Sequence, residues 1–321
     1  MTRITRSMYD KDLQSYYRLG RILTWVASRN WGLRFVHRAM FGPTVGRQLK
    51  GVKNDEIQIP SVSTPGHSIR ARVYRRLDSK GLVPAMLYVH GGGYQVGTPE
   101  QAHDFFADLL KRRDIAIIAP AYRLSLAGHP FPAGLNDCFD TLMHMKTQAD
   151  QLEIKNDNFI LAGHSGGGGM VAALTLKVVD EKAANIAFQM PIYPMLDHRM
   201  QTQSAQNMVG TMIWDRDSNA LAWDNYIGHL NGDVPDYASP ALRADLGNLP
   251  PTVSFVGDME PFKDETIAYI DALKEAGVET RFKLFKGGMH GFEILAPKAP
   301  IAQDANAFQL GAFEEFFERY T

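Results

Sequence analysis

Six short runs of β-forming residues recur along most of this chain, and segments long enough for helices separate most of them. The runs are Val83–Val89, Ile115–Ala119, Phe159–Ala162, Ile186–Met190, Thr252–Val256 and Thr280–Phe285. Strands that alternate with helices form a parallel sheet with right-handed crossover connections. The pattern therefore predicts an α/β fold. The 321 residues suit one large α/β domain with an insertion, so we expect a single domain over residues 1–321.

Two further runs precede this pattern. Glu56–Pro60 and Ser68–Tyr74 have strand character, and the turn-forming pair Pro65 and Gly66 stands between them. Strands joined by so short a connection pair in antiparallel fashion. We therefore predict an antiparallel edge on an otherwise parallel sheet.

Two segments depart from the alternation of strands and helices. Residues 1–50 hold ten Lys and Arg but only two Asp, a net charge of +8, whereas the remainder carries −9. We interpret residues 1–50 as amphipathic helices that lie on an acidic body. His198–Asp236 is polar and contains Trp214 and Trp223 but no strand signal, so we predict an insertion with helices of its own.

Composition excludes several classes of function. The net charge of −1 creates no general field that would recruit nucleic acid. Cys138 is the only cysteine, which excludes an internal disulfide and a thiolate zinc cluster, and we expect no metal. No apolar run approaches the roughly 20 residues of a membrane span. We expect a cytoplasmic protein without a membrane partner, and anchoring of the basic residues 1–50 at a membrane surface stays open as an alternative.

The segment Gly163–Gly167 reads Gly-His-Ser-Gly-Gly and stands between a predicted strand and a predicted helix. It matches G-x-S-x-G, the turn that raises a nucleophilic serine above the sheet in α/β enzymes. Two phosphate-binding loops fit less well. A Walker loop needs Lys after its second glycine, but Gly169 follows Gly168, and a dinucleotide loop needs glycine where Ser165 stands. Ser165 is therefore a candidate nucleophile.

An elbow serine requires an acid and then a histidine, in that chain order. His290 lies in a glycine-rich segment after the run that ends at Phe285, where the base belongs. Two carboxylates, Asp258 and Glu260, follow the run that ends at Val256. Both are candidates for the residue that orients His290.

A third glycine-rich segment, His90–Tyr94, reads His-Gly-Gly-Gly-Tyr and directly follows a predicted buried strand. Consecutive glycines allow backbone N–H groups to turn inward without hindrance from a Cβ atom. Such a segment supplies oxyanion donors in lipases and esterases.

With these residues the chain resembles the hormone-sensitive-lipase-like carboxylesterases of the α/β-hydrolase superfamily, from about Ala85 to the C-terminus. The motifs that carry the resemblance are HGGGY at His90–Tyr94, AYR at Ala121–Arg123, HPFPAGLND at His129–Asp137, GHSGGG at Gly163–Gly168, YPMLD at Tyr193–Asp197, EPFKDE at Glu260–Glu265 and HGF at His290–Phe292. The resemblance implies an eight-stranded, mostly parallel sheet. It also implies a cap made of residues 1–50 and an insertion at about 198–236.

By the same resemblance, Ser165 is the nucleophile, His290 the base and Glu260 the acid. The family usually has Asp at the last position, and Glu is longer by one CH2 group, so Asp258 remains a competing acid. The N–H groups of Gly92, Gly93 and Gly166 correspond to the oxyanion donors. The pocket residues that we predict are His90, Tyr94, His164, Tyr193 and Trp214.

The function implied is a serine carboxylesterase that acts on short- to medium-chain acyl esters without a cofactor. Two alternatives stay open. The first alternative is a hydrolase that cleaves amide or formyl groups. It is suggested by His164, which replaces the acid of the family's GDSAGG motif and makes the elbow similar to that of arylformamidases. A ligand-binding protein is the other, because plant gibberellin receptors resemble this family but have lost the catalytic histidine. The family also suggests a homodimer through the last sheet edge, near Thr280–Phe285.

Overall fold

The computed structural model describes residues 4–321 and contains one eight-stranded sheet. The strands are β1 (Val52–Pro60), β2 (Ser68–Arg76), β3 (Ala85–Val89), β4 (Ala116–Pro120), β5 (Phe159–His164), β6 (Ile186–Ile192), β7 (Thr252–Gly257) and β8 (Thr280–Phe285). Their order across the sheet is β1-β2-β4-β3-β5-β6-β7-β8. β2 pairs antiparallel with both β1 and β4, and all other pairs are parallel. The predicted α/β fold with an antiparallel edge is confirmed.

The sequence of each strand reflects its place in the sheet. β3, β4 and β5 lie in the middle and are buried along their whole length, as expected for continuous apolar runs between two helical layers. β8 lies at an edge and alternates between half-buried and exposed positions in its first half. This edge is where we predicted dimerisation, which stays a prediction.

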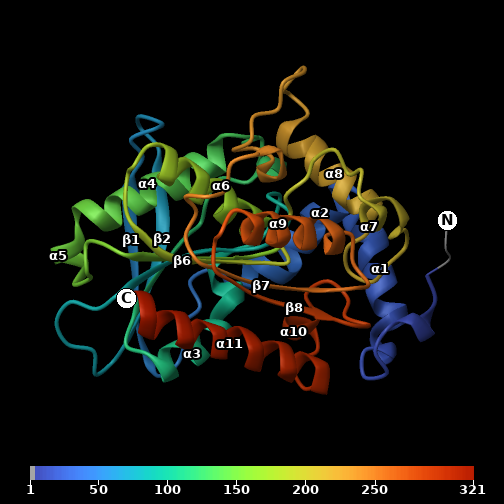
Figure 1. Ribbon diagram of the computed structural model, residues 1–321, viewed down its shortest axis with the longest axis horizontal. Helices are drawn as coiled ribbons and strands as arrows, with labels where there is room; N and C mark the ends of the chain where they lie inside the picture. Colours follow the sequence, from blue (N-terminus) through green and yellow to red (C-terminus); the bar gives the residue numbers. More distant parts are fainter. Residues whose placement is uncertain (1–3) are drawn as a thin grey trace.

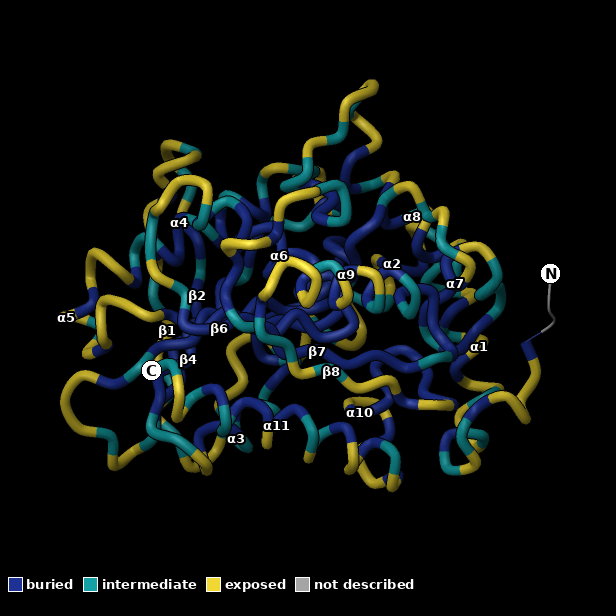
Figure 2. Tube along the Cα trace, viewed as in Figure 1, coloured by how far each residue is buried: buried dark blue, intermediate teal, exposed yellow. Residues whose placement is uncertain are grey.

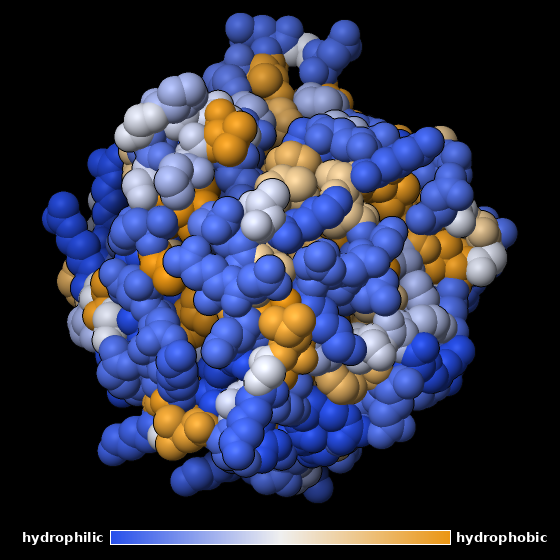
Figure 3. All heavy atoms as spheres, turned by 90° about the vertical axis from the view of Figure 1, so that its left-hand side faces the viewer, coloured by the Kyte–Doolittle hydropathy of each residue, from blue (hydrophilic) through white to orange (hydrophobic). Residues whose placement is uncertain are grey.

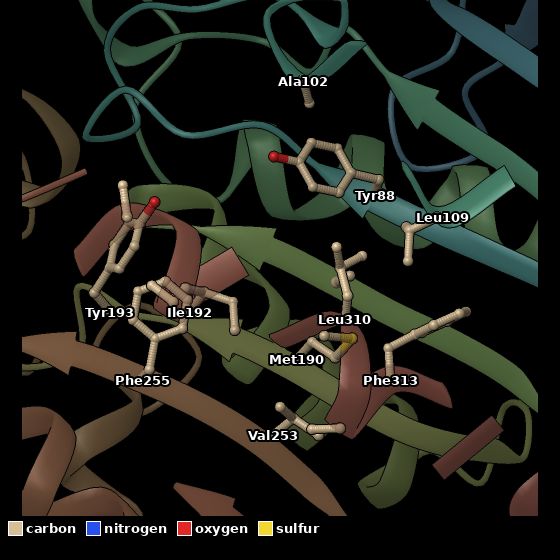
Figure 4. Close-up of a cluster of buried hydrophobic side chains, with 14 of the residues drawn as sticks. Tyr88, Ala102, Leu109, Met190, Ile192, Tyr193, Val253, Phe255, Leu310 and Phe313 are labelled. Carbon is tan, nitrogen blue, oxygen red and sulfur yellow. The ribbon is translucent and has the colours of Figure 1, made fainter. Parts of the chain in front are cut away.

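Helices cover both faces of the sheet (Figure 1). α3 (His103–Arg112) and α11 (Pro300–Tyr320) pack on one face, and α4 (Ala133–Thr147), α6 (Gly166–Asp180) and α9 (Lys263–Glu275) pack on the other. Two shorter helices, α5 (Ala149–Leu152) and α10 (Phe292–Leu295), extend these layers. The strands form the buried centre of the molecule (Figure 2). On the α11 face, side chains such as Met190, Phe255 and Phe313 form a continuous apolar core (Figure 4).

The two segments that depart from the strand–helix pattern lie against each other. Residues from the N-terminal part form α1 (Tyr17–Ala27) and α2 (Asn30–Val36), and the predicted insertion contains α7 (Gln203–Asn207) and α8 (Arg216–Ile227). The Thr24 hydroxyl donates to the carbonyl of Thr211 (2.8 Å), and the N–H of Ile213 donates to the carbonyl of Gly20 (3.3 Å). The predicted helices are therefore present in both segments. Residues 1–3 of the predicted cap lie outside the described residues.

The loops that carry the glycine-rich motifs follow β3, β5, β7 and β8, which are parallel strands. The carboxyl ends of parallel strands meet at one edge of a sheet, where ligands bind in open α/β folds. The topology therefore brings residues about 90, 165, 260 and 290 together, although 200 positions separate the first from the last.

Candidate active site

Ser165 occupies a sharp turn between β5 and α6. Its backbone angles, φ 58° and ψ −124°, are unusual for a residue with a side chain and indicate local strain. The two glycines that flank the turn are required by close packing. A Cβ atom on Gly163 would lie 2.5 Å from the carbonyl oxygen of Gly167, and one on Gly167 would lie 2.2 Å from that of Val89. Packing thus restricts both glycine positions of the G-x-S-x-G spacing to a residue without a Cβ atom.

His290 connects Ser165 to Glu260. The imidazole Nε2 lies 2.8 Å from Ser165 Oγ, and Nδ1 lies 2.5 Å from Glu260 Oε2. All three residues are buried, and Glu260 is completely so. The second carboxylate oxygen of Glu260 accepts the N–H of Gly257 (3.2 Å). With Nδ1–H donated to Glu260, the lone pair of Nε2 is free to accept the hydroxyl proton of Ser165, which is the arrangement of a catalytic triad.

The competing acid, Asp258, has a different position. Its Oδ1 accepts the N–H of Gly287 at 2.6 Å, which ties the loop after β7 to the loop after β8. The two loops also touch through glycines, because a Cβ on Gly257 would lie 2.2 Å from the carbonyl oxygen of Gly288. Of the two candidate acids, the structure therefore brings Glu260 into hydrogen-bond contact with His290.

The N–H groups of Gly92, Gly93 and Gly166 lie beside Ser165. Gly92 and Gly93 have positive φ values, 122° and 59°, and a Cβ on Gly166 would lie 2.8 Å from the backbone nitrogen of Gly93. Within residues 4–321, none of these three N–H groups donates to a protein acceptor. Gly166 is the first residue of α6, and the first N–H groups of a helix have no partner within it. The three groups can therefore bind an external oxygen.

A cavity of about 940 Å³ opens beside Ser165 and His290. Three of the predicted pocket residues, His164, Tyr193 and Trp214, are part of its wall. α1 and α2 supply an apolar section, which includes Leu23 and Leu33. The cavity thus lies between the sheet and the N-terminal helices.

The prediction that His90 and Tyr94 line the pocket is wrong, because both side chains pack behind the glycine loop. His90 stacks on Tyr122 at 4.3 Å between ring centroids, and its Nδ1 lies 2.9 Å from the carbonyl oxygen of Gly91. Tyr94 stacks on Tyr226 at 4.1 Å and donates its hydroxyl to the carbonyl of Met195 (2.7 Å). Both flanking rings are therefore buried in the core, at 1% and 2% exposure, whereas the glycines between them line the cavity.

His164 is held on both sides of its ring. The hydroxyl of Tyr88 lies 3.0 Å from Nδ1, and the side-chain oxygen of Gln309 lies 3.3 Å from Nε2. The Gln309 amide nitrogen donates to Asn306 (2.6 Å), so its oxygen acts as the acceptor and His164 Nε2 carries the proton. Burial lowers the pKa of His164 to about 4, so the ring is neutral at pH 7.

Sequence reasoning missed Glu293, which lines the same cavity. Its side chain is buried, one carboxyl oxygen accepts the hydroxyl of Tyr193, and within residues 4–321 the other oxygen has no hydrogen-bond partner. Burial raises the pKa of Glu293 to about 7. The available signal was the acidic residue three positions after His290, but an isolated Glu in a sequence gives no indication of burial.

Within residues 4–321 no cluster of three or more His, Cys, Asp or Glu side chains is arranged to hold a metal ion. None of the helices in that range has the length and apolar character that a membrane crossing requires.

Comparison with known proteins agrees with this architecture. A family profile described as an α/β-hydrolase fold matches residues 86–294. The chain is 29% identical to carboxylesterase NlhH of Mycobacterium tuberculosis over 255 residues, 77% of this chain and 78% of that protein. It is 26% identical to an ethyl acetate hydrolase of Pseudomonas putida over 230 residues, 71% and 72% of the two chains. The solved structure of a bacterial heroin esterase superimposes with a TM-score of 0.90 at 29% identity and covers 98% of this chain and 99% of its own. The family profile spans well over half of the chain, which therefore belongs to the α/β hydrolases, in the hormone-sensitive-lipase-like family.

Proposed function

We propose that this protein is a serine carboxylesterase that hydrolyses short- to medium-chain acyl esters through Ser165, His290 and Glu260. The observation that carries the proposal is the position of His290, which bridges the other two side chains at 2.8 and 2.5 Å on the wall of a cavity. The carboxylesterase and ethyl acetate hydrolase among its relatives support ester hydrolysis.

The mechanism follows from the geometry. His290 Nε2 removes the proton of Ser165 as Oγ attacks the ester carbonyl, and Glu260 holds the imidazole in the required tautomer and stabilises the imidazolium. The carbonyl oxygen becomes negatively charged beside the N–H groups of the oxyanion glycines. Because those donors have no hydrogen-bond partner within residues 4–321, they need no rearrangement to receive it.

The tetrahedral intermediate collapses when its bond to the alcohol oxygen breaks. His290 Nε2–H gives its proton to the departing alcohol, and the acyl group remains on Ser165. A water molecule then occupies the place of the alcohol and loses a proton to Nε2. Its oxygen attacks the acyl carbon, and the resulting intermediate collapses when the bond to Ser165 Oγ breaks. His290 Nε2–H returns its proton to Oγ as the carboxylic acid leaves.

We propose that the N-terminal helices and the insertion act together as a cap that limits substrate size. Hydrogen bonds between the Thr24 region and residues 211–213 support a joint role, because they connect the two segments directly. Leu23, Leu33 and Trp214 give the cavity an apolar wall that suits an acyl chain. The ethyl acetate hydrolase among the relatives supports a short chain.

Neither alternative gains support from a specific observation. An arylformamidase-like role was suggested by His164, but both nitrogens of that ring are hydrogen-bonded, to Tyr88 and to Gln309, so neither is free to act on a substrate. A ligand-binding protein of the receptor type lacks the catalytic histidine, whereas His290 is here in contact with Ser165.

The proposal is tested by hydrolysis of p-nitrophenyl acetate, butyrate, octanoate and laurate. We expect activity on the shorter esters, and a loss of about 10⁴-fold or more in kcat for Ser165→Ala. Ser68→Ala, at an exposed position on β2, is the matched control and should retain full activity. The proposal fails if the folded wild-type protein cleaves none of these esters, or if Ser165→Ala cleaves them as well as the wild type.

A further inference from the structure

The outer surface of the N-terminal helices is unusually apolar. Six of its large side chains, Leu19, Ile22, Trp25, Trp31, Phe35 and Met40, are each between 50% and 64% exposed. Soluble proteins scatter single exposed apolar residues, but a contiguous group of this kind marks an interaction surface. We call these six residues the apolar face.

Each helix exposes large apolar side chains to solvent. On α1, Leu19, Ile22 and Trp25 follow one another at intervals of three, whereas the buried positions are Gly20 and Thr24, which contact the insertion. On α2, Trp31 and Phe35 are four residues apart and exposed, whereas Gly32 and Leu33 are buried. Both helices therefore carry apolar side chains on their outward side as well as toward the protein, unlike an ordinary surface helix, whose outward side is polar.

The apolar faces of the two helices are continuous. The rings of Trp25 and Trp31 meet edge to face at 6.1 Å between centroids. The guanidinium of Arg29 lies 4.2 Å from the ring centroid of Trp25 and joins a positive charge to the aromatic surface.

The chain segment that carries the apolar face has charge of one sign only. Residues 13–54 contain eight Lys and Arg and no Asp or Glu. Arg18, Arg21, Arg34 and Arg38 are exposed, and none of them makes an ion pair with another side chain of residues 4–321. Trp, Leu and Phe interspersed with unneutralised Arg are the composition of helices that lie in the plane of a membrane surface, where Arg attracts anionic lipid.

The opposite side of the molecule is different. Figure 3 shows the side that lies farthest from α1, and its surface is mainly hydrophilic with separated hydrophobic side chains. The side shown therefore has no apolar surface comparable to the apolar face.

The apolar face also borders the candidate active site. The inward side chains of the same helices, such as Leu23, Ala27 and Val36, line the cavity that holds Ser165, and Met40 belongs to both the cavity wall and the apolar face. The cavity wall and the apolar face are thus built from the same helices, and they share Met40.

We propose that the N-terminal helices dock on an anionic phospholipid bilayer, and that esters dissolved in that bilayer are the substrates that enter the Ser165 cavity. The docking half of the inference is independent of the chemistry. The substrate half rests on the proposed esterase function.

Docking is tested with the full-length protein and sedimenting vesicles of phosphatidylcholine, with and without 30% phosphatidylglycerol. We expect binding to the anionic vesicles at low salt, and weaker binding in 0.5 M NaCl or without phosphatidylglycerol, because exposed charges are screened. Trp25→Ser/Trp31→Ser/Phe35→Ser should weaken binding at least tenfold. The matched control is Leu77→Ser/Leu82→Ser, which removes two exposed apolar residues elsewhere and should bind as the wild type does.

The substrate half is tested with two esters. None of the three substituted aromatic residues lines the cavity, so the triple variant should hydrolyse water-soluble p-nitrophenyl acetate at the wild-type rate. With p-nitrophenyl octanoate incorporated in anionic vesicles, its rate should fall at least tenfold. Ser165→Ala should bind vesicles normally, which separates a failure of docking from a failure of the esterase function.

Three results would overturn the inference. Wild-type protein that stays in the supernatant with anionic vesicles at low salt is one, and wild-type binding by the triple variant is another. The third is a wild-type protein that elutes as a dimer in size-exclusion chromatography and does not bind vesicles, together with a triple variant that elutes as a monomer. A second copy of the chain would then cover the apolar face.

Discussion

The carboxylate of Glu260 lies 2.5 Å from Nδ1 of His290 and is inaccessible to solvent, whereas Asp258, two residues earlier, bonds to the backbone of Gly287. Of these two carboxylates, the one on the longer side chain, Glu260, therefore orients the imidazole. This arrangement leads to a prediction that distinguishes the two carboxylates.

Glu260→Gln should lower kcat by about 10³–10⁴-fold, because an amide does not stabilise the imidazolium and favours the wrong tautomer. Glu260→Asp retains the charge but shortens the reach by one CH2 group, so its loss should be smaller. The measurement is kcat and KM on p-nitrophenyl butyrate. Asp258→Asn is the control and should change kcat by less than about tenfold, since it removes a contact between loops. A greater loss of kcat in Asp258→Asn than in Glu260→Gln would reverse the assignment.

Gly167→Ala should disrupt the serine turn. Its Cβ would lie 2.2 Å from the carbonyl oxygen of Val89 and 2.6 Å from that of His90, so the elbow and the end of β3 would have to separate. We expect the free energy of unfolding to fall by about 3 kcal/mol or more and activity to be lost.

Gly311→Ala is the matched control for that substitution, because Gly311 is exposed within α11 and a Cβ there meets no atom within 4 Å. Alanine is the better helix former, so this variant should be more stable by about 0.5–1 kcal/mol. Urea unfolding measures both variants. Equal effects of the two substitutions would mean that the close packing at Gly167 is not what restricts that position to glycine.

Much of this architecture can be predicted from sequence because the relevant signals are local. The apolar run of β5, the glycines around Ser165 and the strand that precedes His290 are each recognisable in a few residues, and the order of the motifs along the chain relates them to one another. The eight strands therefore begin and end within a few residues of the predicted limits.

Prediction from the sequence fails where the position of a side chain depends on a contact between distant segments. His90 and Tyr94 flank three glycines, and only the folded loop decides that their rings stack on Tyr122 and Tyr226. Glu293 is buried because Tyr193, a hundred residues earlier, and α11 lie against it. The choice between Asp258 and Glu260 likewise depends on how closely the loops after β7 and β8 approach.

Glu293 should make stability depend on pH. Burial raises its pKa to about 7 in the folded protein, above the value of an unfolded Glu, so the folded state binds more protons between pH 4.5 and 7. The associated stability is present below pH 4.5 and is lost as the pH rises through 7. Glu293→Gln removes this loss, so its stability relative to the wild type should increase by on the order of 3 kcal/mol between pH 4.5 and 8.

The measurement is urea unfolding of both proteins at several pH values. Glu275→Gln, at an exposed position at the end of α9, is the control and should follow the wild type. A constant difference between Glu293→Gln and the wild type across this range would show that Glu293 does not titrate there.

Trp214 should restrict the length of the acyl chain. Its ring lies against the oxyanion loop, since a Cβ on Gly93 would be 2.6 Å from the ring, and it is 6.3 Å from the imidazole of His290 between centroids. Trp214→Ala enlarges the cavity at this point and should raise the ratio of kcat/KM for octanoate to that for acetate by about tenfold, equivalent to about 1.4 kcal/mol of additional apolar contact for the longer chain.

Trp214→Phe retains a large ring and should shift the ratio less, and Trp25→Ala, on the solvent-facing side of α1, should leave it unchanged. If the ratio for Trp214→Ala equals that of the wild type, the acyl chain lies elsewhere in the cavity, and the apolar wall formed by Leu23 and Leu33 is then the next section to alter.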